Sequence, residues 1–291
     1  MNFAQCFSLA IKNIAANKTR SILTMLGIII GVAAVIVITG LGNGMDIYMR
    51  ESFESMGTNS FSIYVYGRGD KYLTVDDMQE IVDDNQDLLD KASPELSGSP
   101  GTIKIGTSTL SATQVAGVNE QYFDIKGLKV DKGRNIQYID CEKRMQVCVI
   151  GTYINQSFFA GRGIGESIKI AGSDYKVIGI MEKKGDGSEY SADNCIFLPY
   201  STVSRLSGKG NIDSFAVSFK DSDKAADAKK LIEDKLTEYF GSSDAFYVSS
   251  ISEYLEEFTR MSNIMVTILT LIAGISLVVG GIGIMNIMLV S

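Results

Sequence analysis

The sequence predicts an α+β membrane protein in which transmembrane helices flank an exterior domain. Two long runs without charged residues, 21–45 and 262–291, enclose a hydrophilic middle. The middle combines helical and strand patterns, and a stretch of short β-rich segments separated by glycine turns interrupts them. We therefore expect an α/β subdomain that is split by a β-rich subdomain and held between two membrane spans.

The first apolar run is long enough to cross a bilayer. As a helix with a rise of about 1.5 Å per residue, residues 22–41 would extend about 30 Å, the thickness of the hydrocarbon core. The basic residues before the run would also suit a signal peptide, but the run exceeds the usual length of about 7 to 15 apolar residues. Residues 40–44 also lack a clear small-x-small cleavage pattern. We expect a retained span over residues 21–45.

Charge predicts the orientation of this span. The first 45 residues contain three basic and no acidic residues, and basic residues favour the cytoplasmic side of a membrane. We expect the N-terminus in the cytoplasm and the middle of the chain outside. Phe3, Phe7, Ile11 and Ile14 recur at helical spacing, which predicts an amphipathic helix along the inner membrane surface.

The second apolar run reaches the last residue of the sequence. Met288, Leu289 and Val290 precede Ser291 without a polar flank. We expect this chain to be a fragment of a longer multi-pass protein of the cell membrane.

Two units of strand and helix lie on either side of the β-rich stretch. Thr74 is placed to cap the helix of the first unit, and Gly241 is placed to end the helix of the second in the left-handed conformation. The predicted strands are 61–66, 103–105, 114–117, 147–150, 167–170, 176–180, 214–219 and 245–248, and a second helix is predicted over 223–240. The two units suggest one α/β subdomain that is interrupted by the β-rich insert.

These patterns divide the chain into six predicted segments. They are a cytoplasmic amphipathic helix (1–20), the first transmembrane helix (21–45), the first part of the α/β subdomain (46–102), the β-rich insert (103–206), the second part of the α/β subdomain with a stalk (207–261), and the second transmembrane helix (262–291).

The sequence lacks the residues that several kinds of enzyme chemistry need. The sequence has no histidine, which removes Ser-His-Asp and Cys-His nucleophiles and imidazole metal ligands. The glycine-rich residues 161–167 lack the lysine of a phosphate-binding loop, and we interpret them as a turn between strands. All 34 acidic residues follow Met45, and such an acidic exterior domain would repel nucleic acid. We expect no catalytic, cofactor or metal site here, and any ATP must be bound by another chain.

Four glycines of the two apolar runs are candidate contact positions. Gly27 and Gly31 form a small-xxx-small pair. Gly274 and Gly280 are positions without a side chain on the second helix. Small residues allow the backbones of membrane helices to approach closely. We predict that these glycines serve helix packing or contacts within a dimer.

Two cysteines of the β-rich insert could form a disulfide. Cys141 and Cys148 could face each other across a short hairpin on the exterior side, where oxidation is possible. The alternative is that both are ordinary buried apolar residues.

Both apolar runs resemble spans of MacB/FtsX-type ABC transporter permeases. Residues 17–32 (NKTRSILTMLGIIIGV) are similar to the first span of that family, and residues 271–291 (LIAGISLVVGGIGIMNIMLVS) are similar to the second. Between them, Tyr122-Phe123, Gly133-Arg134 and Leu198-Pro199 fall where the exterior domain of the family has similar residues. The resemblance covers nearly the whole chain.

The resemblance implies a permease with four spans, of which this chain holds two. It also implies that the exterior domain has a porter-like α/β subdomain, which is split by a β-rich Sabre-like subdomain. Two permeases pair in the family, and ATPases that bind ATP and Mg²⁺ move the exterior domains through the first two spans, a process called mechanotransmission. Because no ATPase precedes the first span in this sequence, we expect ATPase subunits to bind as separate chains.

The resemblance leaves two classes of function open. The first is export of an amphipathic compound, antibiotic or peptide, with an exterior adaptor protein of the membrane-fusion type as a further partner. The second is an FtsX-like signal relay that activates an exterior partner such as a cell-wall hydrolase. The two-part exterior domain favours export, because FtsX-like relays usually carry a smaller loop. Lipoprotein extraction is a weaker third hypothesis, since the apolar residues around Phe158 and Phe159 more often pack in a core than accept a lipid.

Overall fold

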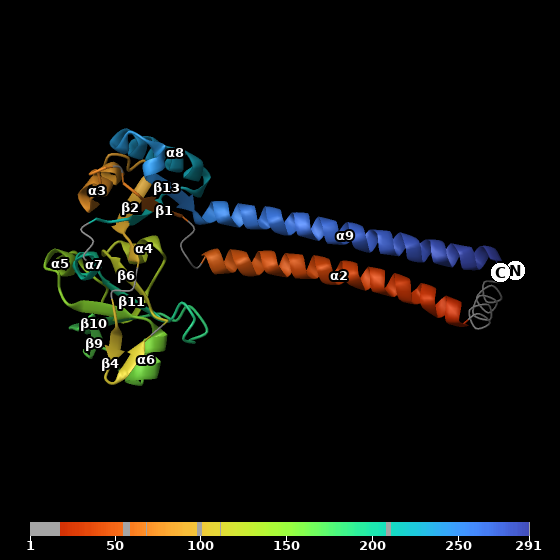
Figure 1. Ribbon diagram of the computed structural model, residues 1–291, viewed down its shortest axis with the longest axis horizontal. Coiled ribbons are helices and arrows are strands. Elements are labelled where there is room, and N and C mark those ends of the chain that lie inside the picture. Colours follow the sequence, from red (N-terminus) through yellow and green to blue (C-terminus); the bar gives the residue numbers. More distant parts are fainter. Residues whose placement is uncertain are drawn as a thin grey trace. The chain divides into compact units, whose positions relative to one another are not determined.

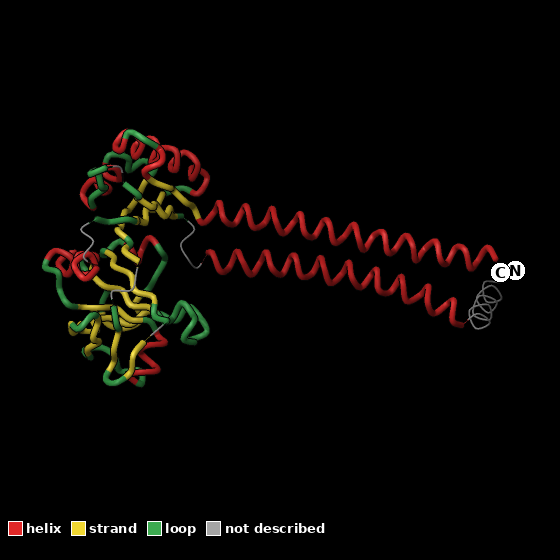
Figure 2. The backbone as a smooth tube through the Cα atoms, viewed as in Figure 1, coloured by secondary structure: helices red, strands yellow, loops and turns green. Residues whose placement is uncertain are grey.

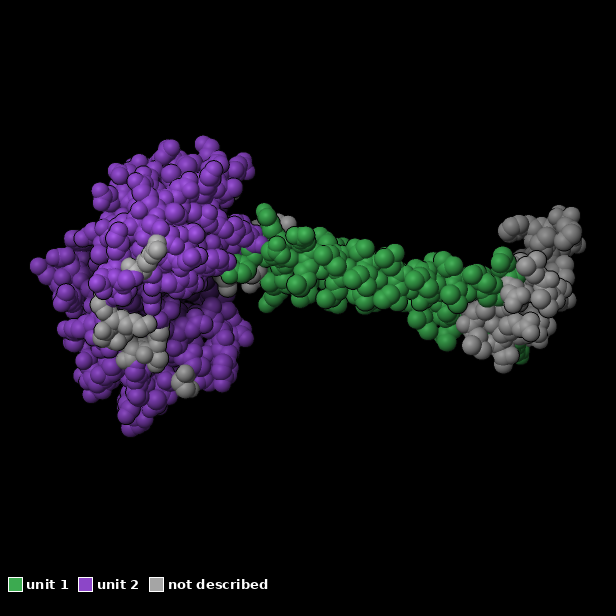
Figure 3. Space-filling view, turned by 45° about the horizontal axis from the view of Figure 1, so that its top comes forward, with its two compact units in different colours: residues 1–51, 254–291 green, residues 52–253 purple. Residues whose placement is uncertain are grey.

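The structure is a computed structural model that describes residues 18–54, 59–67, 69–97, 101–110, 112–207 and 211–290. It divides into two compact units (Figure 3). The helical unit comprises residues 1–51 and 254–291, and the globular unit comprises residues 52–253. The amphipathic helix predicted over residues 1–20 lies outside the described residues except for its last three positions, which belong to the first long helix.

Two long helices that lie side by side build the helical unit. They are α2 (Lys18–Glu54) and α9 (Ile251–Val290), drawn in Figures 1 and 2. Each is long and apolar enough to cross a membrane, over Met25–Met49 and Ile251–Gly283, and only 6% of each apolar window is buried. Neither helix therefore has the burial of a core helix. Both extend past the predicted spans because no proline interrupts the polar turns that adjoin the apolar runs.

A four-stranded antiparallel sheet forms the first part of the globular unit. Its strand order is β13-β1-β12-β2, and helices α3 and α8 cover one face (Figure 1). The elements are β1 (Ser60–Val65), α3 (Val75–Asp83), β2 (Leu89–Pro94), β12 (Ser214–Phe219), η1 (Ser222–Lys224), α8 (Ala225–Phe240), η2 (Ser243–Ala245) and β13 (Phe246–Ser250). Because β12 pairs with both β1 and β2, the sheet exists only when the chain returns after the insert. This is the β-α-β-β-α-β arrangement of ferredoxin-like folds, and it confirms the split α/β subdomain.

The first sheet follows the periodicity and capping signals of the sequence. Phe61, Ile63 and Val65 alternate into the core of this sheet, as one face of a strand should. Thr74 begins α3 through a capping box, in which its hydroxyl accepts from the Asp77 amide and the Asp77 carboxylate accepts from the Thr74 amide. α8 ends at Gly241, whose φ is 72°. These local signals were predicted from the sequence and are confirmed.

A nine-stranded mixed sheet forms the second part, the β-rich insert. Its order is β3-β6-β11-β8-β10-β9-β4-β5, and β7 pairs with β10. The elements are β3 (Leu96–Ser97), β4 (Ile103–Ile105), β5 (Ser108–Leu110), β6 (Gln114–Val118), α4 (Tyr122–Ile125), β7 (Val130–Gly133), α5 (Tyr138–Glu142), β8 (Val147–Ile150), α6 (Thr152–Phe159), β9 (Ser167–Ile170), β10 (Ser173–Met181), β11 (Cys195–Pro199) and α7 (Tyr200–Ser207). All five strands predicted between residues 103 and 180 are present.

Two details of the insert differ from the prediction. The second sheet begins at β3 rather than at residue 103, because Leu96 and Ser97 pair with Gly117 and Ala116 of β6. Two residues are too few for an alternating pattern to reveal a strand. Residues 160–166 connect α6 to β9, so the glycine-rich residues 161–167 are not a turn between two strands.

Candidate functional site

Small residues line the contact between α2 and α9. A Cβ built on Gly27 would lie 3.9 Å from the Cα of Gly280, and a Cβ built on Gly31 would lie 3.5 Å from Cδ1 of Leu277. A Cβ on Gly280 would in turn lie 3.2 Å from Cγ1 of Ile28. The helices therefore approach closely where the sequence has glycine, as small residues permit. We call this contact the glycine seam and define it by Gly27, Gly31, Gly42 and Gly280 with the residues opposite them.

Gly42 is the tightest position of the glycine seam. A Cβ at this position would come within 2.5 Å of Cγ2 of Val266, so even alanine requires one helix to shift. Gly42 was not among the glycines predicted from the sequence. A signal was available, because Gly42 follows Gly31 by 11 residues, about three helical turns, and so lies on the same face.

The seam positions on α9 have the spacing of a packed helix pair. Val266, Ala273, Leu277 and Gly280 are separated by seven, four and three residues, the repeat of left-handed antiparallel packing. Ala273 is only 4% exposed. Gly274 is its neighbour and lies off the seam, with no atom within 4 Å of a built Cβ. The predicted role of these glycines in a dimer stays a prediction.

A hydrogen bond joins the two helices one turn beyond Gly42. The Thr259 hydroxyl donates to Oδ1 of Asp46 over 3.2 Å, and both residues are half-buried. Asp46 is the only charged residue of Met25–Met49 and lies near the end of that range, directly after the apolar run 21–45. A hydrogen bond from the opposite helix lowers the cost of holding a half-buried carboxylate there.

Cys141 and Cys148 are free thiols, so the disulfide considered from the sequence is not formed. Side chains alternate along β8, where Cys148 and Ile150 join the larger core cluster and Val149 joins the smaller one. Cys141 belongs to the smaller cluster, and its thiol donates to the Val118 carbonyl over 3.6 Å. The two cysteines therefore lie on opposite faces of the sheet, because residue 141 is on helix α5 rather than on a hairpin strand.

Polar side chains of the insert join it to the first sheet at the free edge of β2. The Asn119 amide donates to the Ala92 carbonyl over 3.1 Å, and the Ala92 amide donates to Oε1 of Gln121 over 3.0 Å. Lys91 and Asp124 form an ion pair at 2.6 Å. An edge strand whose backbone groups are satisfied in this way cannot pair with another chain.

Glu95 forms a second set of contacts at this junction. The Tyr122 hydroxyl donates to Oε1 of Glu95 over 2.8 Å, and Lys126 Nζ lies 3.7 Å from Oε2. Burial, and then the neighbouring Glu95 carboxylate, raises the pKa of Tyr122 well above its usual range, so the phenol stays a donor. We call residues 91–95 with 119–126 the polar junction, because it joins the two sheets of the globular unit.

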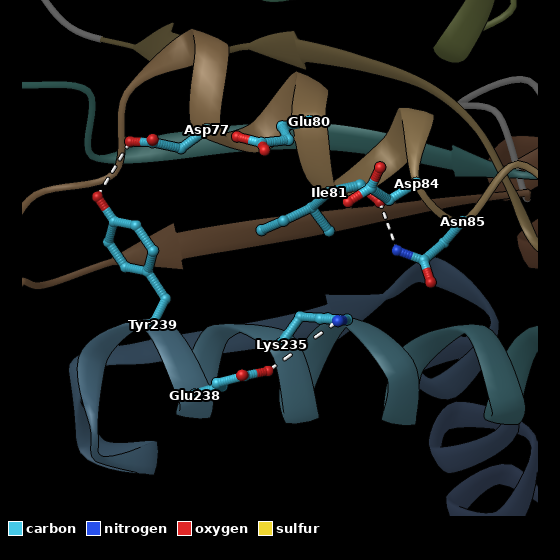
Figure 4. A pocket seen from close by; sticks show the side chains of 8 residues that line it. All are labelled: Asp77, Glu80, Ile81, Asp84, Asn85, Lys235, Glu238 and Tyr239. Carbon is cyan, nitrogen blue, oxygen red and sulfur yellow. Dashed lines mark hydrogen bonds and ion pairs between the residues drawn. The ribbon is translucent and has the colours of Figure 1, made fainter.

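An acidic cleft of about 280 Å³ lies between α3 and α8 (Figure 4). Its lining residues are Asp77, Glu80, Ile81, Asp84, Asn85, Lys235, Glu238 and Tyr239. The Tyr239 hydroxyl donates to Oδ2 of Asp77 over 3.0 Å. Although burial alone would raise the pKa of Asp77, hydrogen bonds from Thr74 and Tyr239 hold it below its usual value. In the described part of the chain, no three side chains of the metal-binding types converge, and we assign no metal site to this cleft.

The architecture defines a membrane protein that carries one large two-part domain between two spans. The MacB-like periplasmic core domain matches this chain over residues 21–235. The chain therefore belongs to the MacB-like periplasmic core domain family, as the resemblance in the two spans predicted.

Curated relatives share the family and are longer than this chain. The macrolide export ATP-binding/permease protein MacB of Neisseria gonorrhoeae is 36% identical over 300 residues, which cover 99% of this chain and 46% of the relative. The protein of the same name from Mannheimia succiniciproducens is 34% identical over 298 residues, which cover 99% of this chain and 45% of the relative. The chain thus spans about half the length of the curated relatives that it matches.

Two solved structures have the same fold as the globular unit. The periplasmic region of MacB from Actinobacillus actinomycetemcomitans has a TM-score of 0.59 at 23% identity, and the match covers 72% of this chain and 97% of that one. The extracellular domain of the noncanonic ABC-type transporter YknZ from Gram-positive bacteria has a TM-score of 0.54 at 16% identity, covering 66% of this chain and 100% of that one. These likenesses establish the fold alone.

Proposed function

We propose that this chain is the part of a MacB-like ABC transporter permease that couples ATP hydrolysis to motion of an exterior domain. One observation carries the proposal, namely that strand β13 ends at Ser250 and helix α9 begins at Ile251 without an intervening loop. The first turn of α9 is also tied to α8, because Glu253 pairs with Lys229 at 2.6 Å. Motion of α9 would reach the sheet through this direct connection.

The proposal requires several partners. ATP and Mg²⁺ would bind to a partner ATPase, and the names of the relatives place an ATP-binding part in their longer chains. A second permease would complete a homodimer, and an exterior adaptor would receive the exported compound. The N-terminus would be cytoplasmic and the globular unit exterior, in agreement with the basic residues that precede the first span.

Export of an amphipathic compound fits the observations better than a signal relay or lipoprotein extraction. The globular unit has two sheets, of four and nine strands, in agreement with the two-part exterior domain that favours export. The relatives at 36% and 34% identity are named for macrolide export. Phe158 and Phe159, which lipoprotein extraction could have used, are half-buried and pack against the larger core cluster. The relay hypothesis is the alternative that an experiment must distinguish from export.

Stimulated ATP hydrolysis distinguishes export from relay. The full-length protein and its ATPase would be placed in lipid nanodiscs, and hydrolysis would be followed while macrolides, cationic peptides or a purified adaptor are titrated. Stimulation by a small compound or by the adaptor supports export. Stimulation by a cell-wall hydrolase alone supports the relay, and a permease that binds no ATPase contradicts both functions.

A further inference from the structure

We propose that Asp46 and Thr259 form a register lock, a positioning pair that prevents α2 and α9 from sliding along each other. The consequence for transport rests on the proposed function, because two helices that keep a fixed register would pass a movement of the ATPase to the exterior domain together. The lock itself rests on geometry within the helical unit alone.

The hydrogen bond lies at the end of the first apolar run, where the two helices still pack against each other. Asp46 directly follows the run 21–45 and accepts from the Thr259 hydroxyl over 3.2 Å, and both residues are half-buried. A half-buried carboxylate loses part of its hydration, and a hydrogen bond from the opposite helix offsets that cost. The bond therefore links the two helices at this point.

The rest of the seam is held by apolar packing, which is less directional than a hydrogen bond. Gly27 and Gly280 face each other, and the side chains of Leu277 and Val266 pack against Gly31 and Gly42. A shift of one helical turn, about 5.4 Å, would move these side chains off their glycines and would also break the bond between Asp46 and Thr259. A hydrogen bond does not survive a shift of that size, because it weakens steeply beyond about 3.2 Å. Asp46 and Thr259 therefore add a directional contact to the packing that distinguishes the observed register from its neighbours.

The structure provides a reporter for the register. A Cβ built on Gly42 lies 3.8 Å from Cβ of Val266, which is the typical Cβ–Cβ distance of a disulfide. Replacing Val266 by cysteine also removes the Cγ2 methyl that would obstruct this Cβ. The pair Gly42→Cys and Val266→Cys should therefore cross-link in the observed register. The pairs Gly42→Cys with Ser262→Cys and Gly42→Cys with Thr270→Cys report a shift of about one turn in either direction.

The lock is tested by cross-linking rates in full-length protein with its ATPase in lipid nanodiscs. Thr259→Val keeps the shape of the side chain but removes the donor, and Thr259→Ser retains the donor as the matched control. We expect Thr259→Val and Asp46→Ala to slow the 42–266 cross-link at least about threefold, the value of one average side-chain hydrogen bond between membrane helices. One of the two shifted cysteine pairs should cross-link faster as the 42–266 pair cross-links more slowly. The cross-linking rates of Thr259→Ser should equal those of the parent. Unchanged 42–266 rates in both Thr259→Val and Asp46→Ala would overturn the lock.

The consequence for coupling is measured on the same samples without the reporter cysteines. We expect the amount of compound exported per ATP to fall in Thr259→Val and to return in Thr259→Ser, whereas a purely structural defect would lower the amount of assembled complex instead. A slipped register with unchanged export per ATP would refute the role in coupling. If the parent protein exports nothing, the proposed function fails, and the cross-linking result still decides whether the lock exists.

Discussion

Single residues of this protein act through the atoms that lie opposite them, not through residue type alone. Gly42 and Gly40 are two residues apart on one helix, yet a Cβ on Gly42 would meet Val266 and a Cβ on Gly40 would meet no atom within 4 Å. The sequence shows two equivalent glycines. Only the position of α9 makes one of them essential to close packing.

Gly42→Ala should destabilise the helix pair by about 1–3 kcal/mol, because overpacking forces the backbones apart. Gly40→Ala should be neutral or stabilising, since alanine is the better helix former and has open space. Thermal unfolding of the purified protein in detergent measures both changes. The double variant Gly42→Ala, Val266→Ala should recover most of the loss. Equal midpoints for Gly42→Ala and Gly40→Ala would contradict this assignment of the seam.

The three cysteines of the globular unit should be unreactive thiols. Burial raises the pKa of Cys141, Cys148 and Cys195 to about 12, so almost no thiolate forms near neutral pH. We expect iodoacetamide at pH 8 to label none of them in the folded globular unit and all three after unfolding without a reductant. Mass spectrometry counts the labels, and a single label after unfolding would reveal a disulfide.

At the scale of elements, local signals predicted helices and strands best where the pattern was long. The strands at 61–66 and 214–219 and the helix capped by Thr74 were predicted close to their observed bounds. β3, with two residues, and the four-residue helix α4 give no periodic signal of their own. They form because neighbouring strands and the polar junction fix them, which is information from distant parts of the chain.

Helix α5 begins around a buried charge, and its stability should depend on pH. Asp140 is fully buried, and Arg134 contacts it through two hydrogen bonds of 2.6 and 3.0 Å. Burial alone would raise the pKa of Asp140, but the bonds from Arg134 and the Gln137 amide hold it below its usual value. A depressed pKa contributes stability above the unfolded value of about 3.9 and loses it as the pH falls through the folded value.

Asp140→Asn should therefore cost about 2 kcal/mol at pH 7, less than a fully buried pair would, because Arg134 is 39% exposed. The loss should shrink as the pH falls from about 4 towards the lower pKa of folded Asp140, where the folded parent also loses the charge. Urea unfolding of the globular unit across this range measures the difference. Asp174→Asn is the control, since its ion pair with Lys169 is exposed and should matter little at any pH. A pH-independent loss in Asp140→Asn would argue against the charged pair.

At the scale of the whole molecule, the polar junction decides whether the two sheets of the globular unit move together. The backbone of Ala92 at the edge of β2 is satisfied by Asn119 and Gln121 from the insert. The contacts pair residues that are 27 and 29 positions apart, and they satisfy polar groups that would otherwise face solvent. The insert therefore also protects an edge that could pair with other chains.

Gln121→Ala should expose the Ala92 amide and speed its hydrogen exchange about fivefold to tenfold, as expected for the loss of one hydrogen bond of about 1 kcal/mol. Gln121→Glu retains an acceptor oxygen and should exchange like the parent. Hydrogen exchange of the globular unit, read by NMR or mass spectrometry, measures both variants. Equal exchange in the alanine and glutamate variants would show that the side chain does not protect this edge.

The amino-acid sequence was enough to predict the two spans, the division of the α/β subdomain around a β-rich insert, the caps at Thr74 and Gly241, and the family. These features follow from long apolar runs, short periods and residue-specific backbone preferences, all of which are local. Three further features became visible only in the folded protein: Cys141 and Cys148 lie on opposite faces of the sheet, Gly42 and not Gly274 belongs to the seam, and Asp46 accepts a hydrogen bond from Thr259. Each of these depends on which distant segment packs alongside, since Asp46 and Thr259 are 213 positions apart and no local pattern records their contact.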